Sequence, residues 1–154
     1  MWHKIKSFAD KLMGQKLSGA DLEDDDFKLS AVALMVHAAR IDGFYSVEEA
    51  LIMRTQIKKY FGITDVEAAE LVKDADKAEH EAIDLYKFTK SLNDQLDNDG
   101  RKEIVKLLWA IVLADNEITP FEDNLIWRVS ELLGVSTKDR IALKEQVKNY
   151  NGKL

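Results

Sequence analysis

The chain lacks cysteine, and it has only one proline and seven glycines among its 154 residues. Without cysteine it has no disulfide framework, no thiolate metal site and no cysteine nucleophile. Basic residues are in deficit, since 22 lysines and arginines against 28 aspartates and glutamates give a formal charge of −6. This balance argues against a nucleic-acid partner, because such binding depends on basic side chains that contact phosphates.

Long hydrophobic runs are also absent. The longest, residues 29–39, is interrupted by Ser30 and His37 and is much shorter than the roughly 20 residues that a membrane span needs. The N-terminal residues do not show the basic region, apolar run and small-residue cleavage site of a signal peptide. We therefore expect a soluble cytoplasmic protein.

Helix signals recur along the whole chain, whereas strand signals are nearly absent. Capping boxes mark three helix starts, at Ser46–Glu49, Thr64–Glu67 and Thr119–Glu122. Gly62 and Gly134 lie where helices would end in the left-handed conformation. The pattern predicts an all-α bundle of about eight helices. We place them near residues 2–13, 27–40, 47–61, 65–78, 82–94, 99–114, 120–133 and 137–149.

The two halves of the chain repeat one pattern. Asp42 and Glu49 in the first half match Asp115 and Glu122 in the second, and each Asp precedes its Glu by seven residues. An apolar helix precedes each Asp, a hydroxyl cap lies between Asp and Glu, and a glycine follows one helix later. The repeat predicts two three-helix units with internal pseudo-two-fold symmetry, joined by helix 82–94.

The repeated pattern resembles the signature of the TerB family, which is named for tellurite resistance. The likeness is clearest at residues 112–122 and 132–135, and it covers roughly residues 27–149. Asn116 stands where the family usually has Gly, and Arg40 lies close before the first repeated Asp, where Ala is usual. The resemblance implies a compact helical module of stress response or metal sensing, not an enzyme, whose acidic residues bind metal.

The repeated acidic pairs are the candidate metal ligands. Asp42 and Asp115 end their helices while Glu49 and Glu122 begin the next ones, so each pair can converge across a short loop. Four carboxylates suit hard divalent cations of the Ca²⁺, Mg²⁺ or Mn²⁺ class, and no organic cofactor is expected. Helix capping alone also explains the two glutamates, but an Asp at a helix C-terminus opposes the helix dipole. A purely protein-binding helical scaffold without a metal site is therefore kept as the alternative.

Other chemistry-bearing patterns have structural interpretations. No Ser/His/Asp arrangement, phosphate-binding glycine loop or nucleophile elbow is found, so we expect no enzyme. Residues 97–100 resemble part of a calcium loop but are better interpreted as a helix N-cap. His37 is interpreted as a core histidine, Arg40 as facing solvent, and Asp76 and His80 as part of a solvated helix face.

An N-terminal stripe is the candidate for membrane or partner binding. Trp2, Ile5, Phe8 and Leu12 lie on one face of a predicted helix whose other residues are rich in lysine. This arrangement is typical of helices that lie at a membrane interface. It is equally typical of a helix that docks its apolar face on a bundle. We favour docking and keep a peripheral membrane contact, a protein partner and a homodimer as alternatives.

The expected domain organisation has three parts. Residues 1–16 form the N-terminal amphipathic helix, residues 17–26 an acidic linker, and residues 27–154 the TerB-like helical domain. Protein partners are expected for such a module.

Overall fold

The computed structural model describes residues 20–41, 46–114 and 117–152 of the chain. These residues form seven α-helices and no strand, which confirms the all-α prediction. The first predicted helix, residues 2–13, lies outside the described residues. The helices are α2 (Ala20–Arg40), α3 (Val47–Phe61), α4 (Asp65–Glu81), α5 (Tyr86–Gln95), α6 (Asn98–Val112), α7 (Pro120–Leu133) and α8 (Thr137–Gly152).

Helix α2 begins earlier than the sequence pattern indicates. It starts at Ala20, so residues 20–26, predicted as linker, belong to the helix instead. The carboxylate of Asp26 accepts hydrogen bonds from Ser91 Oγ (2.6 Å) and Gln95 Nε2 (3.3 Å), which anchor this turn on α5.

Helix α5 begins later than predicted, at Tyr86 rather than at residue 82. Ala82 is extended (φ −75°, ψ 138°) and ends α4. Oδ1 of Asp84 then accepts the backbone N–H of Tyr86 at 2.9 Å, which satisfies one of the free amides of the new helix. Residues 82–85 therefore form a connection between α4 and α5.

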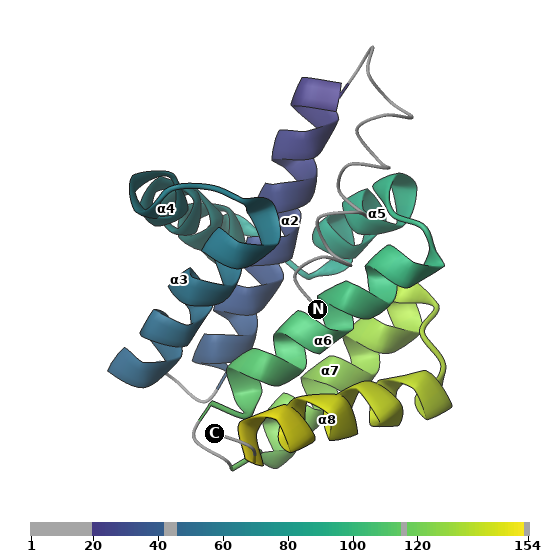
Figure 1. The fold of residues 1–154 in the computed structure, drawn as a ribbon. Coiled ribbons are helices and arrows are strands. Elements are labelled where there is room, and N and C mark those ends of the chain that lie inside the picture. The colour runs from purple at the N-terminus through teal and green to yellow at the C-terminus, as the bar shows by residue number, and fades with distance from the viewer. Residues whose placement is uncertain (1–19, 42–45, 115–116, 153–154) are drawn as a thin grey trace.

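The helices form two three-helix units. In the first unit α2 packs most extensively on α4, and in the second α6 packs in the same way on α8, the third helix of its unit. Figure 1 shows α2 and α6 at the centre, with α3 and α4 on one side and α7 and α8 on the other. The repeat in sequence thus corresponds to a repeat in packing.

The core lies along the two central helices. Residues 31–36 of α2 are all at most 1% exposed, so this helix is buried all round rather than along one stripe. On α6, the buried Trp109 donates its indole N–H to the carbonyl of Arg140 at 3.0 Å, and the ammonium of Lys144 lies 5.2 Å from the ring centroid. These contacts hold α8 against α6.

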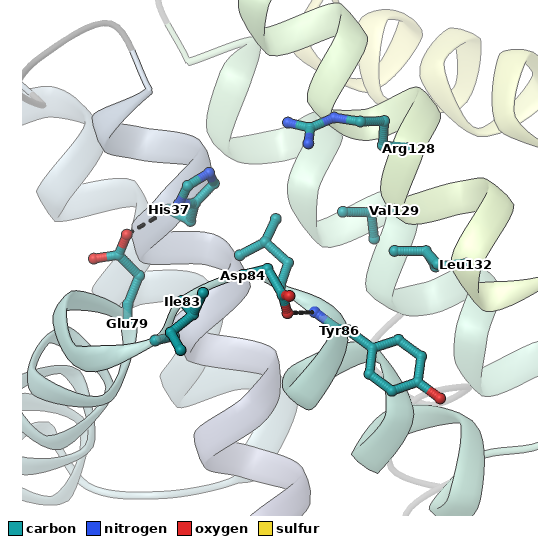
Figure 2. A pocket seen from close by; sticks show the side chains of 10 residues that line it. His37, Glu79, Ile83, Asp84, Tyr86, Arg128, Val129 and Leu132 are labelled. Atoms are coloured by element: carbon teal, nitrogen blue, oxygen red, sulfur yellow. Dashed lines mark hydrogen bonds and ion pairs between the residues drawn. The ribbon is translucent and has the colours of Figure 1, made fainter.

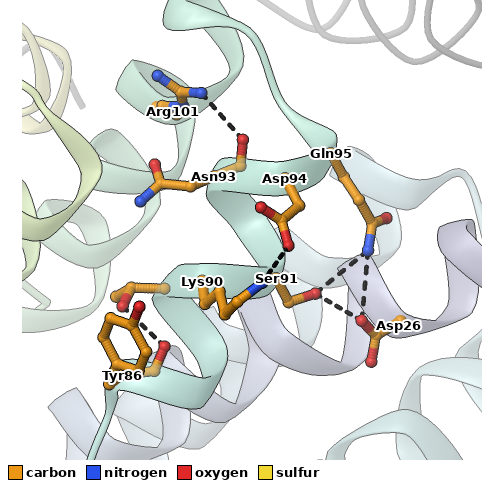
Figure 3. Close-up of polar contacts among 9 residues, drawn as sticks. Asp26, Tyr86, Lys90, Ser91, Asn93, Asp94, Gln95 and Arg101 are labelled. Carbon is orange, nitrogen blue, oxygen red and sulfur yellow. Dashed lines mark hydrogen bonds and ion pairs between the residues drawn. The ribbon is translucent and has the colours of Figure 1, made fainter.

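Helix α5 is fixed to both units (Figure 3). Asn93 Nδ2 donates to the carbonyl of Leu132 at the end of α7 (2.8 Å), and the Asn93 carbonyl accepts from Arg101 of α6 (2.9 Å). The bonds from Ser91 and Gln95 to α2, given above, complete the attachment. The connecting helix therefore fixes the two units relative to each other.

Within the three described ranges, no helix combines the length and apolar character needed to cross a bilayer.

Candidate functional site

The repeated acidic pairs lie at the α2–α3 and α6–α7 connections. Glu49 and Glu122 are in the described residues, in the first turns of α3 and α7. Asp42 and Asp115 lie outside the described residues, so the structure places only half of the predicted ligand set.

The first pair includes the capping box of α3. Ser46 is the N-cap in extended conformation, and its Oγ accepts the backbone N–H of Glu49 at 3.1 Å. In return Oε1 of Glu49 accepts the backbone N–H of Ser46, also at 3.1 Å. The local sequence dictates this geometry, since a hydroxyl and a carboxylate three residues apart can satisfy each other's amides.

The second pair repeats the arrangement at α7. Thr119 Oγ1 accepts the N–H of Glu122 at 3.2 Å, and Oε1 of Glu122 accepts the N–H of Thr119 at 2.9 Å. Pro120 occupies the first helical position, where its fixed φ suits the helix and its missing N–H is not needed.

A third capping box, at α4, differs in its surroundings. Thr64 and Glu67 make the same reciprocal bonds at 3.0 and 3.1 Å. Glu67 is exposed, however, whereas Glu49 is 9% and Glu122 is 5% exposed. The N–H of Thr64 donates to the Glu67 carboxylate and holds its pKa below the usual value, with a smaller contribution from the Thr64 side chain.

The two repeat-related helix starts lie at one end of the molecule. In Figure 1, α3 and α6 run in opposite directions, and the C-termini of α2 and α6 point to the same end. Tyr60, near the C-terminus of α3, donates to Glu103 near the N-terminus of α6, as this antiparallel packing requires. The N-terminus of α3 therefore lies toward the C-terminus of α6.

No three or more His, Asp or Glu side chains in the described ranges are grouped so that they could hold a metal ion. Glu49 and Glu122 lie at the two connections, and the other two predicted ligands, Asp42 and Asp115, lie outside these ranges. The four-carboxylate site stays a prediction.

The structure also shows the positions of two other features that the sequence analysis interpreted, residues 97–100 and Arg40. Asp97 is the N-cap of α6 and accepts the N–H of Gly100 at 2.9 Å, which confirms the capping interpretation of residues 97–100. Arg40 does not simply face solvent, because it pairs with Asp76 and Glu79 of α4.

His37 is not a core residue. Its side chain is 29% exposed, and its Nδ1 lies 2.9 Å from Oε1 of Glu79. The ring lies at the edge of a cavity between α2, the 82–85 connection and α7 (Figure 2). The apolar residues around His37 concealed this position, because residues 31–36, just before it, are buried while His37 itself is partly exposed.

The sequence did not reveal the buried pair Tyr60–Glu103. The phenol donates to Oε2 of Glu103 at 3.3 Å, and both side chains are less than 10% exposed. Burial raises the pKa of Tyr60 well above its usual value, and the charge of Glu103 adds to the shift. The partners are 43 residues apart, so no local spacing could have signalled the pair.

The residues of the N-terminal stripe, Trp2, Ile5, Phe8 and Leu12, lie outside the described residues. Their membrane or partner contacts stay predictions.

Comparison with known proteins identifies the family. The family model described as "Tellurite resistance protein TerB" matches residues 28–145, well over half of the chain. This match confirms the resemblance seen in the repeated helix–Asp–Glu pattern. No curated protein and no solved structure matches the chain significantly.

Proposed function

We propose that this chain, which belongs to the TerB family, is a non-enzymatic module of metal or oxyanion stress response. It acts by binding a divalent metal cation through its two repeated acidic loops and by contacting other proteins. The proposed ligands are Asp42, Glu49, Asp115 and Glu122.

The burial of two of the three capping glutamates carries the proposal. Glu67 shows that the capping bonds form equally well when the carboxylate is in solvent. Glu49 and Glu122 make the same bonds while largely removed from water. Burying a carboxylate costs free energy unless it is compensated. A cation bound at the two repeat-related positions would add to the compensation that the capping hydrogen bonds of Glu49 and Glu122, and the further contacts of Glu122, already give.

The arrangement of the helices supports convergence of the two loops. The α2–α3 and α6–α7 connections leave from the same end of the two central helices. Hard cations such as Ca²⁺ and Mn²⁺ take several oxygen ligands, and a carboxylate supplies one or two of them. Glu49 and Glu122, together with Asp42 and Asp115 from the preceding loop residues, would meet this demand in type and number.

Ligand variants test the proposal. Asp115→Asn and Glu122→Gln each remove one charge while retaining shape and hydrogen-bonding groups. Saturating Ca²⁺ or Mn²⁺ should raise the melting temperature of the wild-type chain, because a ligand that binds only the native state stabilises it by mass action. Both variants should lose most of this increase.

Glu67→Gln is the matched control, because Glu67 occupies the same capping position without a partner Asp seven residues upstream. It should keep the full metal-dependent increase. An equal increase in all four proteins would overturn the metal proposal.

The protein-binding scaffold remains the second candidate, and one observation favours it. Val47 and Leu51 lie one turn apart on α3 and are 83% and 65% exposed. Exposed apolar side chains that cluster on one face are typical of protein contacts. If no cation raises the melting temperature, while Leu51→Ser abolishes self-association in sedimentation, the scaffold account with a homodimer replaces the metal account.

A further inference from the structure

A half-open cavity lies where the two units meet the connecting segment. Its volume is about 460 Å³, and it is bounded by the C-terminal half of α2, the C-terminal end of α4, the 82–85 connection and α7. This volume lies within the range of sites for small molecules. The cavity does not include the acidic loops, so it is separate from the proposed metal site.

The walls of the cavity are mainly apolar. Ile83, Leu85, Val129 and Leu132 contribute to them. Ile83 is fully exposed and Leu132 is 44% exposed, although both are large apolar residues. Arg128 and Leu132 are four residues apart on α7 and therefore lie on the same face of that helix, and Val129 also lines the cavity.

The acidic side chains that line the cavity have hydrogen-bond or ion-pair partners, whereas its arginine has none among the described residues. Glu79 is paired with His37 and Arg40, and Asp84 accepts the N–H of Tyr86. Arg128 makes no hydrogen bond or ion pair with any residue in the described ranges. Figure 2 shows its guanidinium extended over the cavity toward His37.

His37 adds a second polar group on the same side. Its Nδ1 is engaged by Glu79, which leaves Nε2 for a ligand.

From this geometry we propose that the cavity binds a carboxylate that is attached to an apolar body. Arg128 pairs with the carboxylate, since a guanidinium matches it with two parallel hydrogen bonds. The apolar body lies against the exposed side chains of Leu132 and Ile83. A phosphate fits less well, because Glu79 and Asp84 line the same cavity and repel a second negative charge.

Two sources supply this chemistry: a free organic acid, or the C-terminal carboxylate of a protein that ends in an apolar residue. Octanoate serves as probe for the first, and the peptide acetyl-Ala-Ala-Leu with a free carboxylate serves for the second. Octanol and the same peptide as an amide are the neutral counterparts. Acetate has the charge without the apolar body.

The readout is NMR of the full chain, following the methyl groups of Val129 and Leu132 and the side-chain Nε–H of Arg128. Octanoate or the peptide acid should shift these signals until the site is saturated. The neutral counterparts and acetate should bind at least about tenfold more weakly. Binding of octanoate alone identifies a free acid, and preferred binding of the peptide acid identifies a protein C-terminus.

Arg128→Gln should weaken binding of the acid about tenfold or more without changing that of the neutral counterpart. Arg128 is exposed and lacks partners in the described residues, so the variant should melt as the wild-type chain does. Lys59→Gln removes one positive charge from an exposed position on α3, away from the cavity, and should bind as the wild type.

Three results would overturn the proposal. The first is that neither acid shifts the cavity signals. The second is that the neutral counterparts bind as tightly as the acids. The third is that Arg128→Gln and Lys59→Gln weaken binding equally.

Discussion

At the scale of single residues, three glutamates make the same local hydrogen bonds in different surroundings. The spacing of Glu49, Glu67 and Glu122 from their hydroxyl caps predicted all three capping boxes, because those bonds depend only on neighbouring residues. Which of the three is buried depends on packing between helices, and no local spacing contains that information. The distinction on which the proposed function rests is therefore visible only in the folded structure.

The pKa of Glu67 depends on its cap. Thr64→Ala removes the hydroxyl and loosens the first turn of α4, so the pKa of Glu67 should rise toward 4.5, its ordinary value. Because the folded-state pKa is the lower one, this carboxylate stabilises the protein above pH 4.5, and that contribution is lost as the pH falls through the folded-state value. Carbon-detected NMR titration of the Glu67 carboxyl measures the shift. An unchanged pKa in Thr64→Ala would show that the hydroxyl does not contribute to the shift.

The Tyr60–Glu103 hydrogen bond should contribute to stability. Tyr60→Phe leaves the buried Glu103 carboxylate without this donor, so the free energy of unfolding should fall by about 1–3 kcal/mol. Urea denaturation at neutral pH measures the change. Tyr150→Phe, at a 54% exposed tyrosine, is the control, and it should change the free energy by about 0.5 kcal/mol or less. Equal effects of the two substitutions would contradict the importance of the buried bond.

At the scale of elements, the sequence predicted the helix ends that neighbouring residues determine. It did not predict the helix ends that depend on contacts with residues far away in the sequence. Helices α3 and α7 have the predicted bounds, because a capping box begins each and a left-handed glycine ends each. The start of α2 was missed. Its acidic first turns resemble a linker in composition, and their anchor, Ser91 and Gln95, lies 65 and 69 residues away from Asp26.

The glycine that ends α7 gives a test at this scale. Gly134 has φ of 71°, and a Cβ there would meet no atom within 4 Å, so the backbone conformation alone opposes a side chain. Gly134→Ala should lower the free energy of unfolding by about 1 kcal/mol. Gly134→Asn should cost less, because Asn adopts the left-handed region more readily. Thermal or urea unfolding compares the two, and equal costs would contradict the conformational explanation.

At the scale of the whole molecule, the repeat in sequence predicted the two-unit arrangement, since each half carries a complete helix–loop–helix pattern. The cavity beside Arg128 could not be predicted in this way. Its polar residues His37, Glu79, Asp84 and Arg128 come from four separate segments and become neighbours only when α5 fixes the two units together. The docking of residues 1–16 also stays a prediction at this scale.

Deletion of residues 1–16 separates two roles of the N-terminal stripe. If this segment docks on the bundle, its removal should lower the free energy of unfolding by several kcal/mol, because it exposes the apolar surface that the segment covers. If it lies on membranes, the full chain should sediment with anionic vesicles at low salt, and the deletion should not. We expect the first result and no sedimentation of the full chain. A deletion variant as stable as the full chain would contradict docking.

Isothermal titration calorimetry of the metal-free chain with Ca²⁺ and Mn²⁺ tests the central claim most directly. The account predicts saturable binding to the wild-type chain and to Glu67→Gln. It predicts binding weakened about tenfold or more in both Glu49→Gln and Glu122→Gln, because each removes a charged oxygen ligand from one of the two loops. The account would be contradicted if the wild-type chain bound neither cation, or if Glu67→Gln weakened binding as much as the other two substitutions.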